Sequence, residues 1–90
     1  MNKKHYVLIT KNSCRYCQGA IELLTEADAS FAYTDMENAP KLLDSTKEQV
    51  AWYTVPIIWE QDIEWEDETP VVKENNFVGG FSELQELLDV

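Results

Sequence analysis

Apolar and polar positions change their period along this chain, and the change predicts its first two elements. Residues 6–10 form a short apolar, β-branched run that is typical of a strand, and the polar residues 11–13 follow it as a loop. From Cys17 onward, apolar residues recur at the three- and four-residue spacing of a helix with one buried face, at Ala20, Ile21, Leu24 and Ala27. We therefore expect a strand that leads into a helix, with the helix ending near residues 27–30.

The middle of the chain predicts a second strand and a second helix. Residues 31–34 are another short apolar and β-branched run. Asn38 then has the character of a helix cap and Pro40 that of a first-turn residue, so we expect a helix from there to about Trp52. The first strand, first helix and second strand together predict a parallel strand pair with a right-handed crossover.

The last third of the chain predicts two more strands and a short helix. Residues 55–59 are expected to form a third strand that opens on proline, and a fourth is expected within 71–78. Their short connection predicts an antiparallel hairpin. Ser82 is expected to cap a last helix whose apolar positions are Leu84, Leu87 and Leu88. The element order is β-α-β-α-β-β-α, a four-stranded mixed sheet with three helices in the α/β class.

Length and charge indicate one small acidic domain. Ninety residues, 44% of them hydrophobic, are enough for a single core over residues 1–90, and no linker or repeat divides them. Seventeen acidic residues against seven basic ones give a formal charge of −10, which argues against nucleic acid and anionic membranes as partners. No apolar run is long enough to span a bilayer, and the start of the chain lacks a secretory signal. We expect a soluble, cytoplasmic monomer with neutral or basic partners.

The main candidate for chemistry is the segment Cys14-Arg15-Tyr16-Cys17, which places two thiols three positions apart where the first strand gives way to the helix. Cys14 is expected at the helix N-terminus, where unpaired backbone N–H groups, the helix dipole and the neighbouring Arg15 all favour a thiolate. Cys17 lies one turn further along, close enough to reach the Cys14 sulfur but shielded by the helix. This asymmetry predicts an attacking thiol and a resolving thiol.

Other interpretations of the two cysteines are less well supported. A structural zinc site normally needs four N or S ligands, and the chain offers only these two cysteines and His5, so we predict no metal ion within one copy. A metal shared between two copies remains an alternative. A structural disulfide across so small a loop would constrain little, and two buried core thiols without chemistry would not require this strand-to-helix position.

Four separated segments of the chain resemble the glutaredoxins, small glutathione-dependent members of the thioredoxin superfamily. The segments are Thr10-Lys11, Cys14-Arg15-Tyr16-Cys17, Thr54-Val55-Pro56 and Gly79-Gly80-Phe81-Ser82-Glu83-Leu84. Each is weak alone, but their order on these elements is specific, and the match covers nearly the whole chain except about 61–69. The chain is most similar to short glutaredoxins of bacteria and large DNA phages. The resemblance implies a thioredoxin-like fold.

The resemblance also implies roles for individual residues. Cys14 matches the nucleophilic cysteine and Cys17 the resolving one. Lys11 matches a cation that holds the glycine carboxylate of glutathione, although an ordinary solvated lysine is the alternative. Pro56 matches a cis-proline that faces the active site, whereas the residues alone favour a trans proline at the start of an edge strand. The implied glutathione-binding residues are Lys11, Arg15, Tyr16, Thr54, Val55, Pro56, Gly79, Gly80, Phe81 and Ser82.

Three departures from the family pattern affect what we expect. Arg15 stands where proline is common, which should alter the redox potential. Ser82 stands where the family often has aspartate, a side chain that holds the γ-glutamyl ammonium, and Glu83 is the nearest substitute. The acidic segment 60–69 is an insertion between the third and fourth strands, expected as an extended hairpin or surface loop. The alternative is a docking element for a basic partner, with Trp59 or Trp65 as an aromatic anchor.

These observations predict a glutathione-dependent thiol–disulfide oxidoreductase that reduces protein disulfides and glutathione mixed disulfides. Glutathione would be a co-substrate and no cofactor would be bound. Ribonucleotide reductase is a client that the resemblance implies for many short glutaredoxins. Three alternatives remain open: a thioredoxin-like reductase fed by thioredoxin reductase, an iron–sulfur carrier whose cluster is ligated with glutathione, and an interaction module in which the thiols are incidental.

Overall fold

Seven elements follow one another in the predicted order in this computed structural model, which describes residues 2–88. They are β1 (Asn2–Thr10), α1 (Arg15–Glu26), β2 (Ser30–Asp35), α2 (Pro40–Val50), β3 (Ile57–Glu66), β4 (Thr69–Gly79) and α3 (Phe81–Leu87). The strands form one mixed sheet in the order β2-β1-β3-β4. β1 is parallel to β2 and antiparallel to β3, and β3 and β4 form an antiparallel hairpin. The predicted fold class is confirmed.

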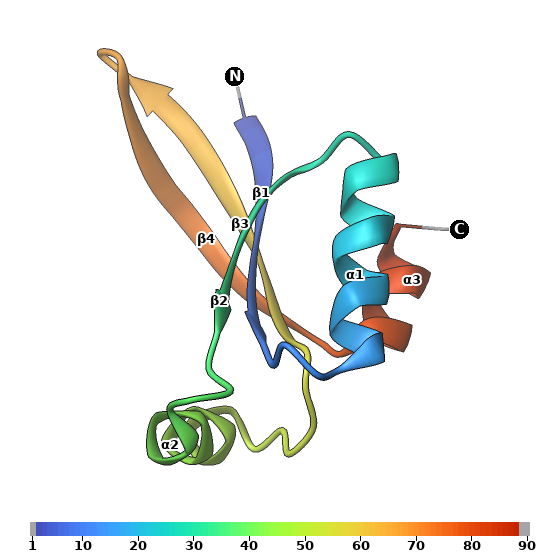
Figure 1. Cartoon of the computed structure of the whole chain (residues 1–90). Coiled ribbons are helices and arrows are strands. Elements are labelled where there is room, and N and C mark those ends of the chain that lie inside the picture. Colours follow the sequence, from blue (N-terminus) through green and yellow to red (C-terminus); the bar gives the residue numbers. More distant parts are fainter. Residues whose placement is uncertain (1, 89–90) are drawn as a thin grey trace.

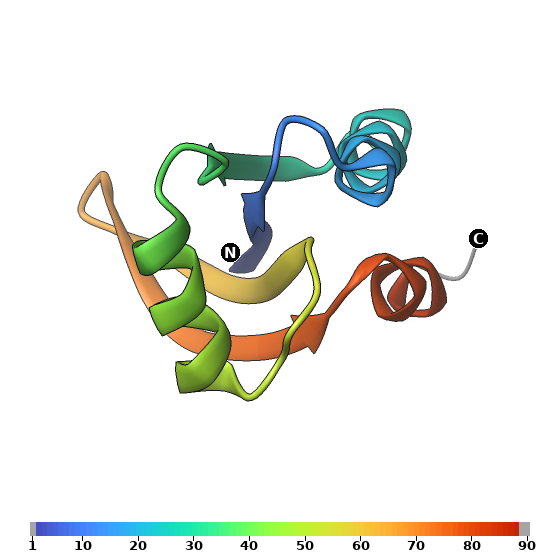
Figure 2. The same cartoon turned by 60° about the horizontal axis from the view of Figure 1, so that its bottom comes forward.

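The sheet is covered on both faces, but unequally. Helices α1 and α3 lie side by side against one face, and α2 lies on the opposite face at one end of the sheet (Figures 1 and 2). Successive residues of β1 point to opposite faces, so Tyr6 and Leu8 join the core under α1 and α3, while Ile9 joins the core under α2. No helix within residues 2–88 has the length and apolar character needed to cross a membrane.

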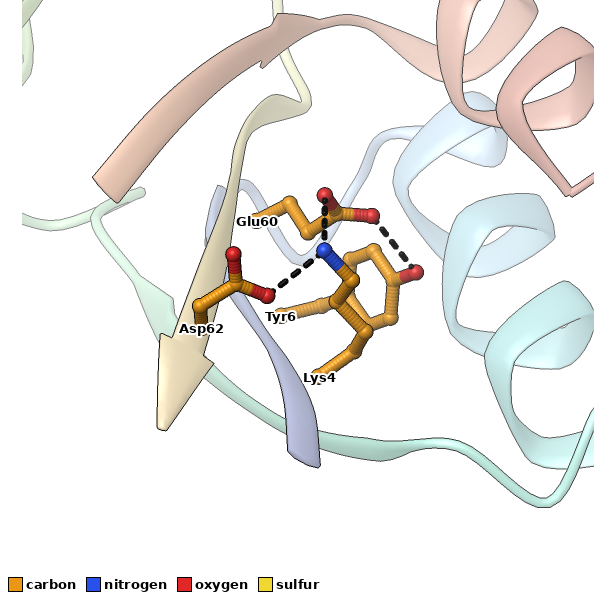
Figure 3. Close-up of polar contacts among 4 residues, drawn as sticks. All are labelled: Lys4, Tyr6, Glu60 and Asp62. Atoms are coloured by element: carbon orange, nitrogen blue, oxygen red, sulfur yellow. Dashed lines mark hydrogen bonds and ion pairs between the residues drawn. The ribbon is translucent and has the colours of Figure 1, made fainter. Parts of the chain in front are cut away.

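The first strand is longer than predicted, because polar residues extend it. β1 begins at Asn2 rather than at residue 6, and the added positions find polar partners across the sheet. The imidazole of His5 hydrogen-bonds to the hydroxyl of Ser30 at 2.7 Å. Lys4 forms ion pairs with Glu60 and Asp62, at 3.4 and 2.6 Å (Figure 3). A search for apolar runs misses a strand whose partners are polar.

The third and fourth strands also differ from the prediction. β3 begins at Ile57, two positions later than expected, and continues to Glu66, while β4 covers residues 69–79 rather than part of 71–78. Most of the acidic segment 60–69 therefore lies in strands, and the extended hairpin is the alternative that the structure adopts. Asp67 and Glu68 form its turn with φ angles of 50° and 67°. The hairpin extends beyond the rest of the sheet (Figure 1).

Two predicted helix caps are wrong. Ala39, not Asn38, is the N-cap of α2 and makes no side-chain capping bond, because Pro40 at the first turn already fixes helical backbone and needs no N–H partner. The N-cap of α3 is Gly80, not Ser82. Its N–H donates to Oε1 of Glu83 at 3.0 Å, so a side chain three residues further along stabilises this helix start. Helix α2 ends at Val50, slightly before the predicted Trp52.

A polar cluster fastens β1 to the base of the hairpin. The Tyr6 hydroxyl donates to Oε2 of Glu60 at 3.0 Å, next to the Lys4 ion pairs (Figure 3). Burial, followed by the hydrogen bond to Glu60, raises the pKa of Tyr6 to about 12. The bond to Asp62 raises the pKa of Lys4, whose ammonium is solvent-exposed. Lys4 therefore stays charged between two carboxylates that would otherwise repel each other.

Candidate active site

Three chain segments meet at one end of the sheet. The end of β1 leads into the loop before α1, and residues 51–56 lead into β3 close by. The Gly79-Gly80 junction between β4 and α3 lies at the same end, which is the lower end of the sheet in Figure 1. Segments that lie far apart in the sequence are thus brought together around the first cysteine.

Cys14 is the N-cap residue of α1, as the sequence predicted. Its backbone is extended, with φ −96° and ψ 116°, and its sulfur accepts a hydrogen bond from the Cys17 N–H at 3.2 Å. The Cys14 thiol also donates to the carbonyl oxygen of Val55 at 3.6 Å. The amide of Cys17 is therefore already positioned to stabilise negative charge on this sulfur during a reaction.

Cys17 occupies a different environment. Only 1% of its surface is exposed, which agrees with the predicted shielding. Burial, with a smaller contribution from the hydrogen bond to Cys14, raises the pKa of Cys17 to about 12, while the backbone N–H of Lys11 acts in the opposite direction. Cys17 is therefore a protonated thiol at neutral pH, and the two cysteines are chemically distinct.

A groove of about 230 Å³ lies beside Cys14, on the side of Val55. It is lined by Tyr16, Trp52, Thr54, Val55, Pro56, Gly80, Phe81, Ser82 and Glu83. The Tyr16 ring is 59% exposed and lies 5.9 Å from the Phe81 ring, centroid to centroid, so the two rings form one aromatic wall. The Val55-Pro56 peptide bond is cis, as the resemblance implied, and Pro56 is buried.

Three of the predicted glutathione-binding residues lie outside this groove. Lys11 lines a second groove of about 260 Å³ on the β1–β2 side of α1, together with Cys17, Tyr33 and Asp35. Arg15 is exposed and lines neither groove. Gly79 is buried behind the groove with a φ angle of 123°, a backbone conformation that favours glycine. The remaining predicted residues are brought together around Cys14.

Trp52 is a groove residue that the sequence analysis did not identify. It follows α2, and its indole packs against the two glycines before α3. A Cβ atom built on Gly79 would lie 3.3 Å from Trp52 Cη2, and one on Gly80 would lie 3.4 Å from Cζ2. The indole N–H is buried without a hydrogen-bond partner in residues 2–88. The available signal was an aromatic residue two positions before Thr54-Val55-Pro56, past the end of the helix.

Gly19 is a second residue that the sequence analysis missed. A Cβ atom at this position of α1 would lie 2.9 Å from Cε1 of Phe81, closer than side chains normally approach. The missing side chain lets the first residue of α3 pack directly on α1. The groove wall formed by Tyr16 and Phe81 therefore depends on a glycine between them and the core.

No cluster of three or more His, Cys, Asp or Glu side chains within residues 2–88 is arranged to hold a metal ion. The two cysteines are free thiols in this structure. The arrangement is thus a pair of thiols of unequal exposure beside a partly aromatic groove, which can perform thiol–disulfide exchange.

Comparisons with known proteins agree with this chemistry. The fold and the paired cysteines define a protein of the thioredoxin-like class of thiol–disulfide oxidoreductases. A family model described as Glutaredoxin matches residues 6–63, and the chain belongs to the glutaredoxin family. Membership of this family implies thiol oxidoreductase activity. No protein in the search of curated sequences matches significantly.

Two solved structures are similar in fold. Glutaredoxin 1 from Francisella tularensis, crystallised with cacodylate, has a TM-score of 0.66 at 24% identity, over 96% of this chain and 93% of that one. The solution structure of glutaredoxin from Brucella melitensis has a TM-score of 0.60 at 22% identity, over 94% of this chain and 78% of that one. At these identities the structures support the fold, and the residue roles depend on the site itself.

Proposed function

We propose that the protein is a glutathione-dependent thiol–disulfide oxidoreductase that reduces protein disulfides and glutathione mixed disulfides. The observation that carries the proposal is the position of Cys14. Its sulfur caps α1, accepts a hydrogen bond from the Cys17 N–H, and contacts Val55 at the edge of a groove large enough for part of a peptide. A nucleophile, a second thiol and a substrate groove are thereby adjacent.

In the first step, the Cys14 thiolate attacks one sulfur of a disulfide. A new bond forms between the two sulfurs as the original disulfide bond breaks, and the other substrate sulfur leaves as a thiolate that takes a proton from solvent. The Cys17 N–H, 3.2 Å from the Cys14 sulfur, stabilises the charge at the start of this step.

The second step resolves the mixed disulfide. Cys17 loses its proton and attacks the Cys14 sulfur, which releases the reduced client and leaves a Cys14–Cys17 disulfide. Two glutathione molecules then reduce this disulfide and become glutathione disulfide. Where the client is a glutathione adduct, a second glutathione thiolate can attack instead, so this branch does not require Cys17.

Glutathione is proposed to bind along the groove between Tyr16 and Ser82. The backbone of Val55 would pair with its extended chain, and the Ser82 end would take the γ-glutamyl carboxylate. Glu83 lines the groove and would provide the negative charge for the γ-glutamyl ammonium, because position 82 has serine in place of the expected aspartate. Lys11 lies in the neighbouring groove, so it would reach only the glycine end of the ligand. The physiological clients would be cytoplasmic disulfide proteins, with ribonucleotide reductase as the one implied by family resemblance.

The test is glutathione-dependent reduction of a small mixed disulfide, coupled to glutathione reductase, for the wild type and two variants. We expect Cys14→Ser to lose activity by about a thousandfold or more, because it removes the nucleophile. Cys17→Ser should retain turnover of the glutathione adduct but lose reduction of intramolecular disulfides. A wild type that is inactive with glutathione but reduced by thioredoxin reductase would overturn glutathione dependence and leave the exchange chemistry intact.

A further inference from the structure

A third groove lies on the same face of the sheet as α1 and α3, between β4 and α3. This β4–α3 groove has a volume of about 460 Å³ and is lined by Glu60, Asn76, Phe77, Val78, Glu83, Glu86 and Leu87. The catalytic scheme above does not use it. Glu83 lines both this groove and the groove beside Cys14, so the two grooves adjoin at the start of α3.

The β4–α3 groove combines apolar side chains with carboxylates. Leu87 is 48% exposed and Val78 is partly buried, whereas the Phe77 ring packs against Trp52 and Trp59, with ring centroids 5.7 and 6.0 Å apart. Three glutamates share the lining with them. Such a surface favours a partner whose segment carries both apolar and positively charged side chains.

The carboxylates of the β4–α3 groove are only partly neutralised. Glu60 is paired with Lys4 at the base of the hairpin. In the part of the chain that the structure describes, Glu83 and Glu86 have no ion-pair partner, and Lys73 of β4 pairs with Glu66 instead. The chain as a whole has ten more acidic than basic residues, so a cationic segment is complementary to the groove and to the surrounding field.

The strand beside the groove is a sheet edge. Among the described residues β4 pairs only with β3, and residues 72–77 are exposed. Its outer N–H and C=O groups are available for an extended peptide to add as a further strand. A peptide held there would place alternate side chains over the groove lining.

We propose that the β4–α3 groove binds an extended segment of a disulfide-bearing client protein, one that carries lysine or arginine together with apolar residues near its reactive cysteine. The client would lie in the groove beside Cys14 and continue past Glu83 onto the edge of β4. This proposal deepens the proposed function because it requires thiol–disulfide exchange with a polypeptide, but it does not require glutathione as the reductant.

The test uses two synthetic peptides, each closed by an intramolecular disulfide. One has alternating lysine and leucine on both sides of its cysteines, and in the other every lysine is replaced by glutamate. Single-turnover reduction by the pre-reduced protein is measured, so the result is independent of glutathione. We expect the wild type to reduce the lysine peptide about tenfold faster at low salt, and 0.5 M NaCl to remove most of that preference.

Two charge-reversal variants locate the preference. Glu86→Lys should lower the preference for the lysine peptide by about three- to fivefold, because attraction in the groove becomes repulsion. Glu22→Lys is the matched control: Glu22 is exposed on α1 outside the groove, and its substitution changes net charge equally. It should leave the ratio nearly unchanged. Both variants should keep wild-type turnover of a small mixed disulfide.

Three results would overturn the proposal. The first is equal reduction of both peptides by an otherwise active wild type. The second is an equal effect of Glu22→Lys and Glu86→Lys, which would assign the preference to overall charge. The third comes from NMR of the Cys17→Ser variant joined to the lysine peptide through Cys14. Amide shifts of residues 74–78 and 83–87 of the protein should change in this adduct. Unchanged shifts there would contradict docking in this groove.

Discussion

The two ends of β3 lie in very different surroundings. At its start, next to the cysteines, Ile57 and Ile58 are fully buried between helices on both faces of the sheet. At its far end, Trp65 is 55% exposed, and only β4 pairs with the strand beyond Glu64 within the described residues. β3 therefore begins in the centre of the core and ends as one strand of a solvent-exposed two-stranded hairpin.

This difference separates two structural tasks. The buried end holds Val55, Pro56 and the glycines before α3 in fixed positions around Cys14, which exchange chemistry needs. The hairpin end is kept soluble by charge, since Lys4 and Lys73 balance part of a row of carboxylates on β3. We therefore expect substitutions at the two ends to differ in their energetic cost even when the residue type is the same.

The largest contrast should come from one residue type at two positions of β3. Ile58→Ala should lower the free energy of unfolding by about 2–4 kcal/mol, because it leaves a cavity in a fully buried core. Ile63→Ala, where the side chain is only half-buried, should cost clearly less. Urea unfolding of both variants measures the difference, and equal losses would show that the hairpin is as tightly packed as the core.

A smaller effect is expected at the glycine junction beside the groove. Gly79→Ala should cost about 1–3 kcal/mol, because the backbone has a φ angle of 123° and the new Cβ would lie 3.0 Å from Cγ of Glu83. Gly80→Ala is the comparison, since its Cβ would lie 3.3 Å or more from its neighbours and its φ is −113°. Thermal unfolding should rank Gly79→Ala as the less stable of the two.

Alkaline pH should lower the stability of the protein through the buried Cys17 thiol at the active-site end. The pKa of Cys17 rises from 9.0 to about 12 on folding, so above pH 9 the unfolded chain loses this proton first and gains stability relative to the native state. Stability of the reduced protein should be nearly constant well below pH 9 and fall between pH 9 and 12, by about 1.4 kcal/mol at pH 10. Cys17→Ser should flatten this fall, as measured by urea unfolding in a reducing buffer. Parallel curves for the two proteins would contradict it.

The smallest effect is expected at the far end of the hairpin. Lys73→Ala removes an exposed ion pair with Glu66, and such solvated pairs contribute little to the free energy of unfolding. The loss should shrink further in 0.5 M NaCl, because salt screens exposed charges. If the urea midpoint of Lys73→Ala moved as far as that of Gly79→Ala, the far end of the hairpin would contribute more to the free energy of unfolding than its exposure indicates.

Much of the fold could be predicted because hydrophobic periodicity follows burial. The apolar positions of α1 and of the first strand indicated the correct elements, and the order of the elements then predicted the parallel and antiparallel pairings. The extra residues of β1 and β3 escaped prediction because their pairing partners are charged or polar, as with Lys4 and Glu60. The cap of α3 was misplaced because Glu83, three residues into the helix, takes the role expected of Ser82.

The candidate site was predictable in its chemistry but less so in its walls. Cys14 and Cys17 were identifiable because their spacing at a strand-to-helix change has few other uses. Trp52 and Gly19 were not identifiable, because each acts through a tertiary contact: Trp52 packs on the Gly79-Gly80 junction, and Gly19 admits the Phe81 ring. No local pattern in the sequence records which residue a side chain will meet across the fold.

The two-residue turn of the hairpin also bears on the order in which the chain folds. β3 and β4 are neighbours in the sequence, so pairing them closes a very short loop, whereas pairing β1 with β3 closes a loop of about 50 residues at a higher entropic cost. The β3–β4 hairpin is therefore expected to form before β1 pairs with β3 and joins the hairpin to the rest of the sheet. In a refolding experiment, Ile63→Ala should then slow folding more than it speeds unfolding, so the part of the molecule furthest from the cysteines would be the nucleus on which their surroundings assemble.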